Sequence, residues 1–158
     1  ITDRPSVLAL SRQNLPTICR KTYAPASGLA KGAYVLADAD GRPDVILMAT
    51  GSEVGLIIKA AEKLKAEGIK VRLVSMPSWD LFEAQPKAYR DSVLPPDITA
   101  RVAVEQAAGL GWDRYTGLAG EMIVMHGFGA SAPAGELEVK FGFTVDAVVA
   151  AARRQAGK

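Results

Sequence analysis

Arg12 is the residue of this chain with the clearest capacity for chemistry. It follows the apolar run 7–10, a pattern that predicts a β-strand with Arg12 just beyond its carboxyl end. In α/β folds, ligands bind at the carboxyl ends of strands. A guanidinium can hold a phosphate or a carboxylate through two parallel hydrogen bonds. We therefore expect Arg12 to bind an anionic group, the alternative being a salt bridge to the segment that follows.

Two glycine-containing turns are weaker candidates for anion binding. Residues 50–53, Thr-Gly-Ser-Glu, join a predicted strand to a predicted helix, whose free N–H groups could face a phosphate. Glu53 would repel an anion, so we interpret the turn as a helix start capped by Ser52. Residues 127–132 match G-x-G-x-x-A. No later strand is predicted to supply a ribose-binding acid, so this segment is interpreted as a tight turn.

The remaining reactive residues lack evident partners. One cysteine, Cys19, excludes an intrachain disulfide framework, and one histidine, His126, leaves no plausible zinc cluster. Neither has a partner that would make a nucleophile pair. Glu105, at the predicted carboxyl end of a strand, is the best-placed single carboxylate. A structural contact to a neighbouring loop or subunit explains it more simply than acid–base chemistry.

Composition limits the class of protein. The 158 residues suit one domain, or a domain plus a strip of a neighbour, and 49% apolar with only 6% aromatic residues predicts an aliphatic core. A net charge of +2 without clustered basic residues argues against a nucleic-acid partner. No apolar run approaches the ~18 to 20 residues of a membrane span. We expect a reduced, cytoplasmic setting, and the initial Ile1 suggests a piece of a longer protein.

Strand and helix patterns alternate along the chain, which indicates how the candidate residues are positioned. Strands are predicted at 33–36, 45–49, 71–74, 100–104 and 122–125. Helices are predicted between Ser52 and Gly68, in one or two pieces of 79–93 broken at Pro86, around 113–118, at 133–141, and after Thr144. Strands separated by helices need crossovers, so we predict an α/β fold, a three-layer αβα arrangement around a mostly parallel sheet of about five strands.

Several blocks resemble transketolases. Ser-Arg-Gln-Asn-Leu-Pro at 11–16 is similar to the motif at which the middle domain of a transketolase passes to its C-terminal domain. The similarity continues, in family order, at 49–54, 74–78, 89–95, 101–105, 128–133 and 141–145. The resemblance implies that 1–16 is the tail of the preceding pyrimidine-binding domain, 17–31 a linker, and 32–158 a transketolase C-terminal domain.

The resemblance also implies a reaction for the complete parent. Transketolases are homodimers that depend on thiamine diphosphate and a divalent metal, Mg or Ca. They transfer a two-carbon ketol unit from a ketose phosphate to an aldose phosphate in the pentose phosphate pathway, and the arginine matching Arg12 binds the substrate phosphate. The implied partners are the remainder of the chain, a second copy and sugar phosphates.

The family motifs for the metal, the diphosphate, the active-site histidines and the activating glutamate are not found in this sequence. We therefore expect no catalytic residue here, no cofactor or metal bound by this chain alone, and no turnover. Dihydroxyacetone synthase, 1-deoxyxylulose-5-phosphate synthase and the beta subunit of a 2-oxo acid dehydrogenase share this type of domain and stay open as alternatives. A regulatory or dimerisation module, holding an effector anion at the Gly51 or Gly127 turn, is a further alternative.

Overall fold

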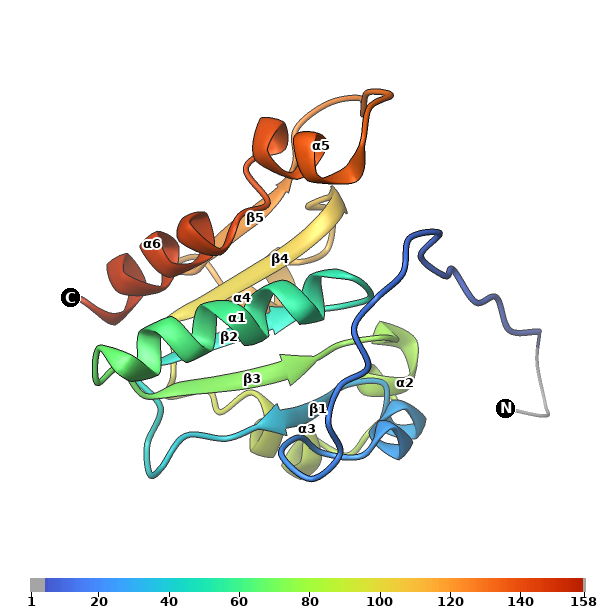
Figure 1. The fold of residues 1–158 in the computed structure, drawn as a ribbon. Helices are drawn as coiled ribbons and strands as arrows, with labels where there is room; N and C mark the ends of the chain where they lie inside the picture. Colours follow the sequence, from blue (N-terminus) through green and yellow to red (C-terminus); the bar gives the residue numbers. More distant parts are fainter. Residues whose placement is uncertain (1–4, 158) are drawn as a thin grey trace.

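A five-stranded sheet organises residues 5–157, the part of the chain that the computed structural model describes (Figure 1). Residues 1–4, which begin the predicted tail 1–16, and Lys158 lie outside the described part. The strand order is β1-β3-β2-β4-β5. The strands are β1 (Tyr34–Ala37), β2 (Val45–Ala49), β3 (Val71–Ser75), β4 (Arg101–Ala108) and β5 (Glu121–Met125). Only β1 is antiparallel to its neighbour, which confirms the mostly parallel sheet.

The central strand β2 explains why its sequence is continuously apolar. All five of its residues are buried, because helices cover both faces of the sheet. Leu47 pairs with Leu73 of β3 on one side and with Val102 of β4 on the other. The prediction of a strand at 45–49 is confirmed without a change in its bounds.

Two long helices form the layer on one face of the sheet. They are α1 (Glu53–Ala66) and α6 (Val145–Ala156), which lie side by side in Figure 1. Ile57 and Leu64 of α1 and Val148 of α6 are fully buried there. Thr144 caps α6 as predicted, since its hydroxyl oxygen accepts a hydrogen bond from the Ala147 amide at 3.2 Å.

Short helices and aromatic side chains form the opposite layer. These helices are α2 (Trp79–Glu83), α3 (Lys87–Val93) and α4 (Asp113–Thr116), and the predicted break at Pro86 is confirmed. The rings of Trp79 and Trp112 meet edge to face with centroids 5.2 Å apart. The aromatic residues, although few, are thus concentrated under one face, and the three-layer αβα prediction is confirmed.

Two local predictions are wrong. Residues 7–10 do not form a strand: Val7, Leu8 and Leu10 are 95%, 73% and 82% exposed, and no strand of the described part of the chain pairs with them. Ser52 stands before α1 but does not cap it, and its hydroxyl instead donates to Glu53 Oε1 at 2.6 Å. Within the predicted linker 17–31, residues Ala26–Lys31 form the 3-10 helix η1.

Strand β4 ends at Ala108, four residues beyond the predicted end at 104. A β-bulge interrupts its pairing with β5 after Glu105, and the pairing resumes at Ala108. Glu105 pairs with Val124 and Ala108 with Met125. Val124 and Met125 are adjacent in β5, whereas two residues separate Glu105 from Ala108. A bulge bends its strand and re-aims side chains, and the exposed residues 106–108 carry no apolar alternation that would reveal it in the sequence.

Candidate functional site

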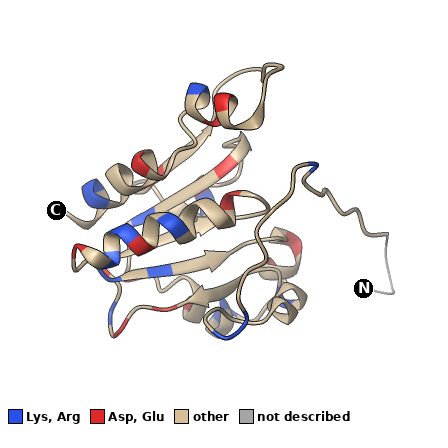
Figure 2. Cartoon of the chain, viewed as in Figure 1, with Lys and Arg blue, Asp and Glu red and all other residues tan. Residues whose placement is uncertain are grey.

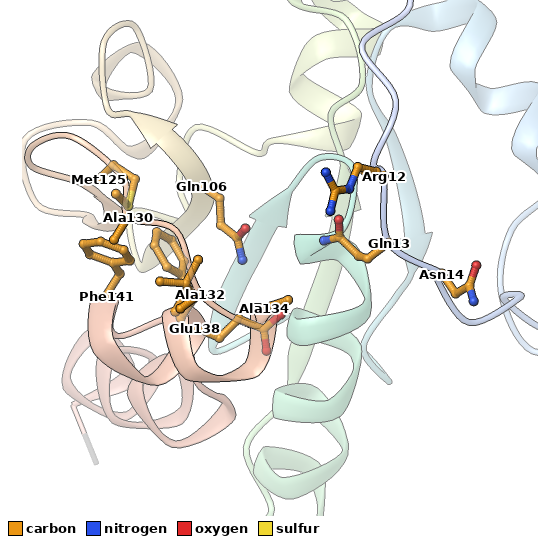
Figure 3. Close-up of a pocket in the computed structure, with 13 residues that line it drawn as sticks. Arg12, Gln13, Asn14, Gln106, Met125, Ala130, Ala132, Ala134, Glu138 and Phe141 are labelled. Carbon is orange, nitrogen blue, oxygen red and sulfur yellow. The ribbon is translucent and has the colours of Figure 1, made fainter.

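A pocket of about 610 Å³ lies where β4 and β5 end, between the tail and α5 (Ala134–Phe141) (Figure 3). The tail supplies one wall, the strand ends a second, and α5 with its preceding loop a third. Its lining residues are Arg12, Gln13, Asn14, Gln106, Met125, Gly129, Ala130, Ala132, Ala134, Leu137, Glu138, Phe141 and Phe143. The location agrees with the general rule that ligands of α/β proteins bind at the carboxyl edge of the sheet.

Arg12 projects from the tail with its guanidinium exposed at this pocket. Within residues 5–157 no hydrogen bond or ion pair involves that guanidinium. The salt bridge that was the alternative interpretation is therefore not formed by the described residues. Gln13 adds an amide from the same wall, so the tail presents several N–H donors to one space.

Gln106 faces the pocket from the sheet side. It is the first residue of the β4 bulge, which directs its amide toward the space that Arg12 also lines (Figure 3). Met125 and Phe141 give the pocket an apolar part, and Glu138 adds one carboxylate. An arginine, the side-chain amides of Gln13 and Gln106 and an apolar wall suit a small polar anion carried on a carbon chain. Sequence reasoning missed Gln106 and Glu138, because neither stands in a motif.

A second pocket, of about 370 Å³, lies at the carboxyl ends of β2 and β3 and is acidic. Glu105 and Asp80 line it together with Thr50, and Glu53 is buried nearby at the start of α1. Burial, with a smaller contribution from the negative charge of Glu53, raises the pKa of Glu105 to about 7. Carboxylates repel phosphate, so this geometry disfavours an effector anion at the Gly51 turn.

His126 and Cys19 line neither pocket, whereas the loop 127–132 contributes Gly129, Ala130 and Ala132 to the lining of the first. His126 is exposed, and so is Cys19, whose thiol has a pKa lowered first by a backbone hydrogen bond from Lys21. Residues 127–132 form an exposed loop, and the described chain after it contains α5 and α6 but no strand, as the tight-turn interpretation required. Among the described side chains, no three His, Cys, Asp or Glu residues converge as a metal site.

Comparison with known proteins identifies the family. The family model described as Transketolase-like TK C-terminal domain matches residues 32–144, more than half of the chain. The chain belongs to the transketolase C-terminal domain family. It is 52% identical over 158 residues to the transketolase of Geobacillus stearothermophilus, covering 99% of this chain and 24% of that protein. The chain thus spans about a quarter of the length of that relative.

Solved transketolases have the same fold. The transketolase of Leishmania mexicana is 44% identical with a TM-score of 0.77, over 83% of this chain and 19% of that one. The transketolase of Pichia stipitis in complex with sedoheptulose-7-phosphate is 34% identical with a TM-score of 0.80, over 92% of this chain and 20% of that one. The predicted transketolase resemblance and α/β fold are confirmed. No helix in the described range is long and apolar enough to cross a membrane.

Proposed function

We propose that this chain is the C-terminal part of a transketolase and that Arg12 binds the phosphate of its sugar phosphates. The complete parent would transfer a two-carbon ketol unit from a ketose phosphate to an aldose phosphate in the pentose phosphate pathway. The observation that carries the proposal is the exposed guanidinium of Arg12, which is unpaired among the described residues and lines one pocket together with the Gln13 and Gln106 amides. The solved relative in complex with sedoheptulose-7-phosphate is consistent with this substrate class.

The physical role of such a contact is orientation. A phosphate held far from the reacting carbon fixes the substrate and lets remote binding energy serve the chemical step. Gln13 and Gln106 offer amide N–H groups at the same pocket, and Met125 and Phe141 can exclude water from the substrate's carbon chain. The contribution of this chain is thus binding rather than bond cleavage.

Thiamine diphosphate and a divalent metal, Mg or Ca, belong to the proposed parent rather than to this chain. The described residues do not fit a metal–diphosphate group, because they contain no convergent metal ligands and the second pocket is lined by Glu105 and Asp80. We therefore assign these groups to the preceding part of the parent, derive no step through them here, and propose no turnover by the 158 residues alone.

We also propose which parts of the parent the tail and the linker belong to, and that the parent is a homodimer. Residues 1–16 are assigned to the preceding pyrimidine-binding domain, whose sheet would supply the strand partners that 7–10 lack here. Residues 17–31 form the linker and 32–158 the C-terminal domain of a cytoplasmic homodimer. The sequence of this chain separates transketolase least clearly from dihydroxyacetone synthase. The upstream sequence of the parent would distinguish the two enzymes.

The test is the replacement Arg12→Ala in the full-length parent. Loss of a charged hydrogen bond costs about 1.5 to 3 kcal/mol, so KM for fructose 6-phosphate should rise about 10- to 150-fold. KM for unphosphorylated fructose should change little, because that substrate lacks the group that Arg12 would hold. Steady-state kinetics with both substrates measures the difference.

The matched control is Arg20→Ala. The Arg20 guanidinium donates to the Ala24 carbonyl oxygen at 2.8 Å and does not line the pocket. This variant should leave both KM values unchanged. Equal increases for the phosphorylated and unphosphorylated substrates in Arg12→Ala would contradict the proposed role.

A further inference from the structure

Two carboxylates at the carboxyl edge of the sheet have no cationic partner in the described chain. Glu53, the first residue of α1, is only 4% exposed, and Glu105 is half-buried on β4. The Ser52 hydroxyl donates to Glu53, but none of the ion pairs formed within residues 5–157 includes Glu53 or Glu105. Buried charges are costly unless they are paired. This edge therefore lacks a positive charge that would balance it.

Large apolar side chains are exposed at the same edge. Leu110 and Phe128 follow the ends of β4 and β5 and are 88% and 100% exposed. The two strands are parallel neighbours, so the loops that follow them emerge on one side of the sheet. The eight-residue helix α5 adds to this edge and has no buried residue, although so short a helix is not stable without packing.

The direction of the tail indicates which part of a longer chain meets this edge. In Figure 1 the tail passes beside the ends of the parallel strands, and Arg12 lines the pocket there. Figure 2 shows acidic residues at the start of α1, near the end of β4 and around α2 on this same side. About three quarters of the relative from Geobacillus stearothermophilus is not matched by this chain. Chain preceding the tail would therefore attach beside the acidic edge.

We propose that Glu53, Glu105, Leu110 and Phe128 form a docking surface, the carboxyl-edge surface, for the preceding domain of the parent. That domain covers Leu110 and Phe128 and inserts a Lys or Arg side chain into the second pocket, against Glu105. Charge complementarity selects the occupant, because Glu105 and Asp80 give this pocket two carboxylates and no cation among its described lining residues, and the negative charge of the buried Glu53 acts on Glu105. The inference rests on the proposed function only in requiring a longer transketolase parent.

The decisive variant is Glu105→Gln, made both in the 158-residue chain and in the full-length parent. In the short chain it removes an uncompensated charge, so the melting temperature at pH 8 should rise. In the parent it removes the partner of the inserted cation, so the domain undocks and exposes the linker 17–31. Limited proteolysis of that linker at pH 8 should then accelerate about tenfold, which corresponds to 1.4 kcal/mol of docking free energy.

The pH dependence provides an internal check in the short chain. The pKa of Glu105 is raised by folding to about 7, so its contribution to stability is fully present below about pH 4.5. That contribution is lost as the pH rises through about 7, and the stabilisation by Glu105→Gln should appear at pH 8 and vanish at pH 5.

A second variant and a control keep the docking test decisive. Phe128→Ser should leave the short chain's melting temperature unchanged, because Phe128 is fully exposed there, but should accelerate linker cleavage in the parent. Asp40→Asn alters an exposed carboxylate in the turn before β2 and should change neither measurement. Linker cleavage that is unchanged or slower in both Glu105→Gln and Phe128→Ser parents would overturn the proposal.

Two further results separate this inference from its alternatives. Sedimentation that shows the short chain pairing with a second copy, and Phe128→Ser abolishing that pairing, would assign the surface to self-association and overturn the proposed occupant. The unmodified parent is also assayed for transketolase activity. If the unmodified parent is active and the linker of both variants is cleaved at an unchanged rate, only the docking proposal is contradicted. If the unmodified parent is inactive, the proposed function is contradicted.

Discussion

Arg101 shows how one half-buried guanidinium joins the start of β4 to the loops around it. Its pKa is lowered by burial, yet no carboxylate pairs with it among the described residues. The side chain instead donates to backbone carbonyl oxygens of Leu94 at 3.4 Å, Pro95 at 2.7 Å, Ile98 at 2.8 Å and Tyr115 at 2.7 Å. The Pro95 carbonyl also accepts from the Ile98 amide at 3.1 Å, but Arg101 supplies donors to the other carbonyls and so has a structural role that its sequence position does not suggest.

We predict that Arg101→Met lowers the free energy of unfolding by about 2 to 4 kcal/mol, because several carbonyl groups lose their donors. Urea denaturation measures the change. Arg42→Met is the control, since Arg42 forms an exposed ion pair with Asp97 and such pairs contribute about 0 to 1 kcal/mol. A loss for Arg101→Met no larger than that for Arg42→Met would show that solvent replaces these donors.

The candidate site illustrates what residue types can and cannot predict. Arg12 was identifiable because a guanidinium after an apolar run is chemically conspicuous and stands in a family motif. Gln106 was not, because an amide next to Glu105 has no distinctive spacing. Its orientation depends on a bulge that requires knowledge of the pairing between β4 and β5.

The junction between η1 and β1 shows how a single backbone conformation connects elements. Gly32 has φ +80°, and its carbonyl oxygen accepts a hydrogen bond from the Ser78 amide at 2.9 Å. A Cβ at this position would overlap the Phe82 amide nitrogen and the Ser78 carbonyl oxygen. The linker, the edge strand and α2 therefore meet at a residue that only glycine can occupy without distortion.

We expect Gly32→Ala to destabilise the domain by at least about 3 kcal/mol, because it combines backbone strain with overlap against main-chain atoms. Thermal denaturation followed by circular dichroism measures this. Gly129→Ala serves as the control, since nothing lies within 4 Å of the added methyl group there. If the two variants melt at the same temperature, the junction is far more plastic than its geometry indicates.

The elements most accurately predicted are those whose pattern is imposed by the core. The strand 45–49 and the helix after Ser52 are bounded by clear changes in apolar spacing, and both are confirmed. The tail strand at 7–10 was wrong because a strand is stabilised by its neighbours, which local sequence cannot supply. The cap at Ser52 failed because Glu53 competes for its hydroxyl.

The whole domain depends little on its tail. Residues 5–16 are exposed, whereas the core is built from the sheet, α1 and α6 on one face and the aromatic layer on the other. We predict that deletion of 1–16 shifts the melting temperature by less than about 2 °C, because little apolar surface is uncovered. Differential scanning calorimetry of both chains checks this.

Deletion of 1–36 is the matching control. It removes the fully buried Ala33 and most of β1, including the buried Leu36, and should prevent cooperative melting. A large loss of stability after deletion of 1–16 alone would mean that the tail packs on the domain in solution.

The bulge in β4 constrains how relatives of this chain can vary. Glu105 and Gln106 are consecutive, yet one lines the acidic pocket and the other lines the pocket of Arg12. Loss of a single codon between Glu105 and Ala108 would realign the strand end and could bring a carboxylate to face the anion-binding wall. We therefore expect insertions and deletions between Glu105 and Ala108 to be eliminated by selection over evolutionary time, because they would change which side chains face the two pockets.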